Sequence, residues 1–212
     1  MKIIAINVGA VAQLFVPATG AAGAREQVMS GIRKSAVSTL AEPDAIEVRP
    51  LGLAGDEQAD LTVHGGHNKA IYAYPVEYYA AWQTMRMQAT HVDEPLPFGF
   101  LGENLTVEGL FETRVWIGDV LEIGGPKQGA AGPVRLRVTA PREPCFKFNA
   151  RMGFSHAARM MVQSGYTGFY LEVLQIGRLA AGGAIRLIGG AREVTIEEMH
   201  RLITRGKRRK LL

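Results

Sequence analysis

The single cysteine of the chain lies in a segment whose residue types suit thiol chemistry. The segment reads Pro141-Arg142-Glu143-Pro144-Cys145-Phe146-Lys147. Its two prolines restrict the backbone and are expected to hold Cys145 at a defined point. Arg142 and Lys147 supply positive charge, which lowers a thiol pKa and favours the thiolate that attacks electrophiles and binds metals. The alternative is an inert cysteine that packs as a small apolar residue.

A second polar segment combines glycines, histidines and a lysine. It reads Gly55-Asp56-Glu57-Gln58-Ala59-Asp60 and, after three intervening residues, His64-Gly65-Gly66-His67-Asn68-Lys69. Adjacent glycines let backbone N–H groups approach an anion, and Lys69 adds the positive charge that suits a phosphate. A competing interpretation is a metal site in which His64 and His67 join Asp56 or Asp60, since imidazole and carboxylate are ordinary ligands. A polar turn that only serves hairpin geometry is the third alternative.

Two further segments place polar or aromatic residues beside glycines. They read Gly99-Phe100-Leu101-Gly102-Glu103-Asn104-Leu105 and Gly165-Tyr166-Thr167-Gly168-Phe169-Tyr170. In the first, Glu103 and Asn104 either orient a ligand or brace a neighbouring loop. In the second, the aromatic rings either wall a flat ligand or pack in the core. The sequence has no GxGxxG, Walker A or GxSxG motif, which disfavours nucleotide-cofactor folds and serine hydrolases.

The elements that must position these residues are mostly strands. Short apolar alternations between glycine, proline and aspartate are typical of antiparallel sheets and barrels, and no regular βαβ alternation occurs. The expected strands are Lys2–Val8, Ala45–Leu51, Ala70–Tyr74, Asn104–Glu108, Val120–Ile123, Val134–Ala140, Phe169–Leu174 and Ala184–Ile188. The sequence therefore predicts a mainly β, barrel-like fold.

A few helices are expected to flank the strands. Two of them cover Pro75–Met87 and approximately His156–Gln163. The third is better specified, because Thr195 with Glu198 three residues later forms a capping-box pattern. It should run from Ile196 to about Arg205 and end at Gly206.

Composition limits the class of protein. The chain has 212 residues, of which 47% are apolar, so we expect one compact soluble domain. Its apolar runs fall short of the roughly 18 residues of a membrane span, and we expect no membrane partner. One cysteine excludes an intramolecular disulfide and zinc sites that need two or more cysteines, and it favours a reducing cytoplasm. The run Lys207-Arg208-Arg209-Lys210 accounts for the whole formal charge of +4, which disfavours a nucleic-acid partner.

Taken in order, these segments resemble a known family, the MOSC domain (molybdenum cofactor sulfurase C-terminal domain). The motifs that carry the resemblance are Gly55-Asp56-x-Gln58-Ala59-Asp60, His64-Gly65-Gly66, Lys69-Ala70-x-Tyr72-x-Tyr74-Pro75, Gly102-Glu103-Asn104-Leu105-Thr106, Ile117-Gly118-Asp119 and Pro141-Arg142-x-Pro144-Cys145-x-Lys147. The resemblance covers Lys2 to Ile188 and points to the stand-alone bacterial branch associated with resistance to hydroxylaminopurine.

The resemblance implies a β-rich barrel with flanking helices and a pocket for molybdopterin-bound molybdenum. It assigns Cys145 as the metal ligand or sulfur carrier. It assigns the remaining site residues to cofactor contacts and pocket orientation: His64, Gly65, Gly66, Lys69, Arg142, Glu103 and Asn104. We expect a MOSC domain over residues 1–190, with a C-terminal helix and basic tail over 191–212 in place of the three-helix extension typical of this branch.

The resemblance further implies a molybdenum enzyme that reduces N-hydroxylated nucleobases or related compounds. The electrons would come from a separate flavoprotein, since the sequence holds no flavin or iron–sulfur motif. The alternatives are sulfur transfer through a persulfide on Cys145, a non-catalytic carrier of the molybdenum cofactor, and a nucleic-acid-binding module that rests only on the basic tail.

Overall fold

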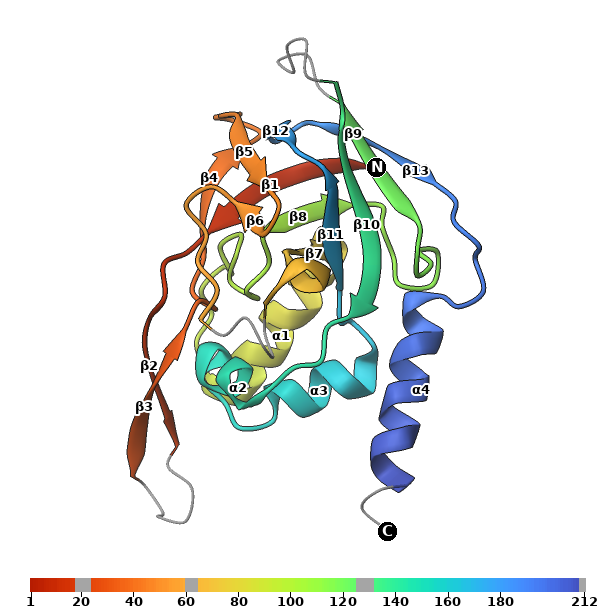
Figure 1. The fold of residues 1–212 in the computed structure, drawn as a ribbon. Coiled ribbons are helices and arrows are strands. Elements are labelled where there is room, and N and C mark those ends of the chain that lie inside the picture. Colours follow the sequence, from red (N-terminus) through yellow and green to blue (C-terminus); the bar gives the residue numbers. More distant parts are fainter. Residues whose placement is uncertain (18–23, 60–64, 125–131, 210–212) are drawn as a thin grey trace.

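The computed structural model describes residues 1–17, 24–59, 65–124 and 132–209. Seven strands close into a barrel in the order β13-β9-β10-β11-β7-β8-β1, with β1 pairing back onto β13 (Figure 1). Their bounds are β1 (Lys2–Val8), β7 (Ile71–Pro75), β8 (Leu105–Glu108), β9 (Val120–Gly124), β10 (Val134–Pro141), β11 (Phe169–Gln175) and β13 (Ala184–Ile188). The β7–β8 pair is parallel and the other barrel pairs are antiparallel. The predicted barrel-like fold is confirmed.

The remaining strands lie outside the closed barrel. β4 (Ser35–Thr39) adds to β1, and β5 (Ile46–Arg49) pairs with both β6 (Gly52–Leu53) and β12 (Gly177–Leu179). Among the described strands, β2 (Ala12–Pro17) and β3 (Arg25–Ser30) pair only with each other, and this hairpin extends away from the barrel (Figure 1).

Strand β7 separates two apolar cores. Because successive side chains of a strand point to opposite faces, Ile71 and Ala73 pack inside the barrel while Tyr72 and Tyr74 face the helices. The helices that cover this outer face are α1 (Tyr79–Thr90), α2 (Phe146–Met152) and α3 (Ala157–Ser164), with the short 3₁₀ turns η1 (His67–Lys69) and η2 (Val76–Tyr78) at the ends of β7. The second core gives Tyr72 a fixed position at the base of the barrel, where the candidate site lies.

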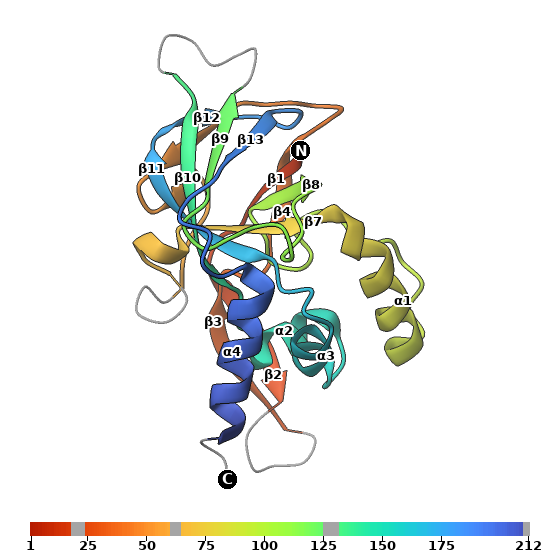
Figure 2. The same cartoon turned by 90° about the vertical axis from the view of Figure 1, so that its right-hand side faces the viewer.

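Helix α4 (Ile196–Arg209) lies beside α3, where His200 Nε2 donates to the Val162 carbonyl at 2.9 Å, and α1 lies on the far side of α2 and α3 (Figure 2). At the start of α4, the Ile196 N–H donates a hydrogen bond to the Val115 carbonyl at 2.9 Å. The predicted capping box is confirmed: the Glu198 N–H donates to Thr195 Oγ1 (3.1 Å), and Thr195 N–H donates back to Glu198 Oε2 (2.9 Å). No helix among the described residues is long and apolar enough to cross a membrane.

Several expected boundaries need correction. The helix stop predicted at Gly206 is wrong, because α4 continues through it to Arg209. Gly206 does not adopt the positive φ of a helix stop, and a glycine inside a helix costs only about 1 kcal/mol. The single strand expected over Ala45–Leu51 is a tight β5–β6 hairpin in which Arg49 pairs with Gly52.

Candidate functional site

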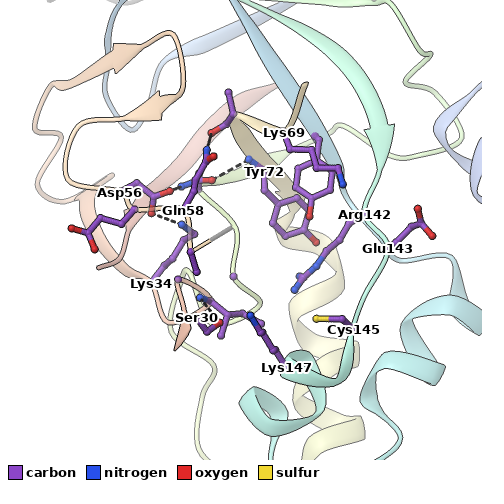
Figure 3. Close-up of a pocket in the computed structure, with 18 residues that line it drawn as sticks. Ser30, Lys34, Asp56, Gln58, Lys69, Tyr72, Arg142, Glu143, Cys145 and Lys147 are labelled. Atoms are coloured by element: carbon purple, nitrogen blue, oxygen red, sulfur yellow. Dashed lines mark hydrogen bonds and ion pairs between the residues drawn. The ribbon is translucent and has the colours of Figure 1, made fainter. Parts of the chain in front are cut away.

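A pocket opens where the base of the barrel meets the end of the β2–β3 hairpin and the start of α2 (Figure 3). Its volume, counted to the open mouth, is about 740 Å³. The pocket contains four of the site residues predicted from the sequence: Lys69, Asn104, Arg142 and Cys145.

Cys145 lies between the end of β10 and the start of α2. Its backbone is extended (φ −119°, ψ 178°), and its carbonyl accepts the Phe148 N–H of the first helical turn at 2.9 Å. The side chain is partly buried and lines the pocket instead of joining either apolar core. This placement disfavours the inert packing role and leaves the thiol within reach of a ligand.

Arg142 lines the pocket and is buried by its neighbours. The residue is 7% exposed, and one guanidinium nitrogen donates to the Leu101 carbonyl. The guanidinium carbon lies 4.8 Å from the ring centre of Tyr72 and 5.0 Å from that of Phe148. Burial pushes the arginine pKa down, but Tyr72, Tyr170 and Cys145 outweigh this and raise it, so the group stays charged. A fixed cation that interacts with Cys145 favours its thiolate.

Two lysines add charge to the walls. Lys69 is the last residue of η1, and its Nζ lies 5.7 Å from the ring centre of Tyr170. Lys147 ties α2 to the hairpin, because its Nζ donates to the Met29 carbonyl at 2.9 Å. The pocket therefore presents cations on more than one side of Cys145.

The opposite wall holds Lys34 and Asp56 (Figure 3), which form a buried polar network with Asn104. Lys34 and Asp56 form an ion pair whose side chains are only 7% and 5% exposed. Asp56 Oδ1 also accepts the Gly9 N–H, and its Oδ2 accepts Asn104 Nδ2, both at 2.9 Å. Asn104 Oδ1 in turn accepts the Tyr72 N–H at 3.1 Å. Burial lowers the pKa of Lys34, and the charge of Asp56 only partly opposes this.

Glu103 lies behind the pocket wall and is not among the lining residues. Its Oε1 accepts the Tyr79 hydroxyl, the Gly99 N–H (2.8 Å) and Thr106 Oγ1 (2.8 Å). These bonds brace the turn that ends at Gly102. That glycine has φ +90°, and a Cβ there would lie 2.9 Å from Cγ1 of Ile32, so the turn requires glycine. Burial raises the pKa of Glu103. Of the two roles considered for this residue, its contacts match the bracing one.

The glycine-histidine segment is only partly described. His64 and Asp60 lie outside the described residues. The Gly66 N–H donates to Gln58 Oε1 at 2.9 Å, and neither Gly65 nor Gly66 lines the pocket. Over the described ranges, no three His, Cys, Asp or Glu side chains gather as a metal site, so the metal interpretation of His67 with Asp56 gains no third ligand there.

Lys34 is not among the site residues predicted from the sequence. It stands in Gly31-Ile32-Arg33-Lys34, which looks like an exposed charged connection, and no motif marks it. Asp56 does belong to a motif, but the contact between the two joins segments 22 residues apart. Their pairing depends on how the hairpin returns to the barrel, which spacing alone does not encode.

Known proteins match this chain in sequence and in structure. A sequence model described as the MOSC domain matches residues 60–186. The chain is 36% identical over 149 residues to YflK of Bacillus subtilis (strain 168), covering 70% of this chain and 61% of YflK. It is 31% identical over 166 residues to YiiM of Escherichia coli (strain K12), covering 78% of this chain and 69% of YiiM.

Two further comparisons extend the set. A Gibberella moniliformis protein named "Reductase" is 32% identical over 139 residues, covering 65% of this chain and 22% of that protein. The crystal structure of YiiM from Geobacillus stearothermophilus superposes with a TM-score of 0.69 at 25% identity, covering 97% of this chain and 85% of that structure. The chain thus spans less than two thirds of YflK and a small part of the fungal protein.

Proposed function

The chain belongs to the MOSC domain family, and on that premise we propose that its pocket binds the molybdenum cofactor through Cys145 and reduces N-hydroxylated nucleobases or related compounds. The observation that carries the proposal is the placement of Cys145 on the wall of an open pocket beside the buried cation Arg142.

The donor set of the pocket fits such a cofactor. A thiolate is a soft ligand that suits a soft metal, and an anionic pterin phosphate calls for nearby cations. Cys145 supplies the sulfur, while Lys69, Arg142 and Lys147 supply positive charge around it. When bound, the cofactor would supply two-electron redox chemistry.

Each of these residues has a separate task in the proposal. Cys145 would hold the metal, and Arg142 favours its thiolate because the guanidinium is charged and buried against the Tyr72 and Phe148 rings. Lys69 offsets the charge of the phosphate from the barrel side. Asn104 fixes the Tyr72 backbone at the pocket base.

Electrons have to reach the pocket from another protein. We infer a separate flavoprotein donor, because the sequence contains no flavin or iron–sulfur motif. The fungal relative supports this redox role: a segment similar to this chain makes up about a fifth of a longer polypeptide named "Reductase".

The test is donor-dependent consumption of hydroxylaminopurine by protein produced in a host that makes the cofactor. Cys145→Ser should abolish turnover and molybdenum binding, because a hydroxyl is a harder and far less acidic ligand. The urea midpoint of the variant should stay close to that of the wild type. Lys69→Ala should weaken cofactor retention and recover with excess cofactor, whereas Lys2→Ala, on an exposed ion pair, should change neither.

Other outcomes would favour one of the alternative functions. A folded and fully loaded protein that turns over no N-hydroxylated substrate with any competent reductant would make the chain a cofactor carrier. Sulfur on Cys145 that cyanide releases, without bound molybdenum, would favour sulfur transfer. Full activity in Cys145→Ser would refute the thiolate assignment.

A further inference from the structure

Lys34 is a buried ammonium on the wall of the pocket. It is the only lysine among the described residues that is classed as buried, and its side chain is 7% exposed. Figure 3 shows it with Asp56 on one side of the pocket, facing Arg142 and Cys145 on the other. An ammonium has three N–H donors, and within the described ranges Asp56 is the one hydrogen-bond partner of Nζ. Two donors thus remain for a molecule in the pocket.

The folded chain does not need Lys34 in order to satisfy Asp56. The carboxylate already accepts the Gly9 N–H and Asn104 Nδ2, each at 2.9 Å. Burying an ammonium, in contrast, costs several kcal/mol, which an ion pair repays only with good geometry. A charged group whose burial destabilises the fold, and which faces a pocket, is more readily explained by a functional role in that pocket.

We propose that Lys34 is a catalytic proton donor that protonates the departing oxygen of the N–O bond, with Asp56 as its positioning residue. This proposal rests on the function proposed above. Two electrons from the reduced flavoprotein and two protons convert the N-hydroxylamine to the amine and water. The N–O bond breaks as Lys34 protonates the oxygen, which leaves as water. The nitrogen takes the electron pair and then a proton from solvent, and Lys34 is reprotonated from solvent.

The chemistry of the leaving group explains why a proton donor belongs there. Hydroxide is a poor leaving group and water a good one, and a placed general acid contributes roughly 100-fold to 10,000-fold to such a step. Burial lowers the pKa of Lys34, which makes it a better acid near neutral pH. Asp56 and Glu103 oppose this lowering, and the charge of Arg142 adds to it. Asp56 also keeps the ammonium aimed at one side of the pocket.

Lys34→Arg is the decisive variant. Arginine keeps the charge that Asp56 pairs with but does not release its proton, since its pKa exceeds about 12. We expect kcat on hydroxylaminopurine to fall at least about 100-fold. Molybdenum per chain and the urea midpoint should stay at wild-type values. The matched control is Lys2→Arg, in an exposed ion pair with Glu108, which should change none of these.

A second substrate separates proton donation from binding. The O-acetyl ester of hydroxylaminopurine releases acetate, which leaves without being protonated. Lys34→Arg should therefore reduce the ester within a fewfold of the wild-type rate. The wild-type kcat on the hydroxyl substrate should fall as pH rises through the lowered pKa of Lys34, while the ester profile stays flat.

Equal losses on the two substrates, or no loss on either, would overturn the proposal. A loaded wild type that reduces neither would instead refute the proposed function, and with it this step. A readout that needs no turnover is acetic anhydride labelling of the cofactor-free wild type, followed by mass spectrometry. Lys34 should reach half-maximal labelling at a lower pH than Lys2. Labelling that matches Lys2, or none without denaturant, would contradict the assignment, even if Lys34→Arg failed to fold.

Discussion

Replacing Asp56 with alanine should strongly destabilise the fold, because the Asp56 carboxylate joins three separate segments. It pairs with Lys34, accepts the Gly9 N–H after β1 and accepts Asn104 Nδ2 before β8. Removing one partner of a buried pair leaves an uncompensated charge and typically costs about 3–5 kcal/mol. Lys34 can lose its proton in this variant, which limits the loss of stability to the free energy of deprotonation. That free energy is about 1.4 kcal/mol per pKa unit. We therefore expect Asp56→Ala to lower the free energy of unfolding by about 3–5 kcal/mol.

The reverse truncation should cost less. In Lys34→Met the carboxylate of Asp56 keeps two N–H donors, so the expected loss is about 1–3 kcal/mol, the range for one missing hydrogen-bond partner. The double variant Asp56→Ala, Lys34→Met should be more stable than the sum of the two losses by at least about 1 kcal/mol, since it buries no unpaired charge.

Urea unfolding of the cofactor-free protein, followed by the fluorescence of the buried Trp82, measures these values. Glu108→Ala is the control, because its pair with Lys2 is 3.4 Å long and about half exposed, and the expected change is below about 1 kcal/mol. A free energy of unfolding of Asp56→Ala within about 1 kcal/mol of the wild-type value, or a larger loss in Lys34→Met than in Asp56→Ala, would contradict this prediction.

Two further predictions concern Glu103 and Thr195. Burial raises the pKa of Glu103 above its ordinary 4.5, so this group stabilises the fold fully below that pH and the contribution is lost as pH rises through the folded-state pKa. Glu103→Gln should remove that decline from a series of urea titrations above pH 4.5, and an unchanged slope would contradict it. Thr195→Ala breaks the capping box of α4 and should cost about 1 kcal/mol. An unchanged urea midpoint would show that barrel contacts alone hold the start of the helix.

The parts of the site that sequence could predict are those encoded locally. Cys145 and Arg142 share one short motif after a strand, and their placement follows from the prolines and the strand end. Strand β7 was predictable as a strand. That its alternate residues pack in two different cores depends partly on α2 and α3, which lie far along the chain, so the apolar run of β7 alone did not indicate it.

What could not be predicted depends on contacts between distant segments. The β2–β3 hairpin brings Ser30 and the following residues to the pocket, yet exposed Phe15 and Met29 on its outer face obscure the polar alternation of a half-buried strand. Helix α2 has only seven residues and starts directly after Cys145, which is too short for a helical period to stand out. Lys34 forms its ion pair with Asp56 only because the chain after that hairpin returns to the barrel.

Cofactor binding through Cys145 is tested most directly by the amount of molybdenum and pterin per chain in protein purified from a host that makes the cofactor. Wild type and Cys145→Ser should be measured side by side, by metal analysis and by fluorescence of the oxidised pterin. We expect close to one molybdenum and one pterin per wild-type chain, with molybdenum lost in the folded Cys145→Ser variant. A folded wild-type chain that carries neither, or a serine variant that retains molybdenum in full, would contradict it.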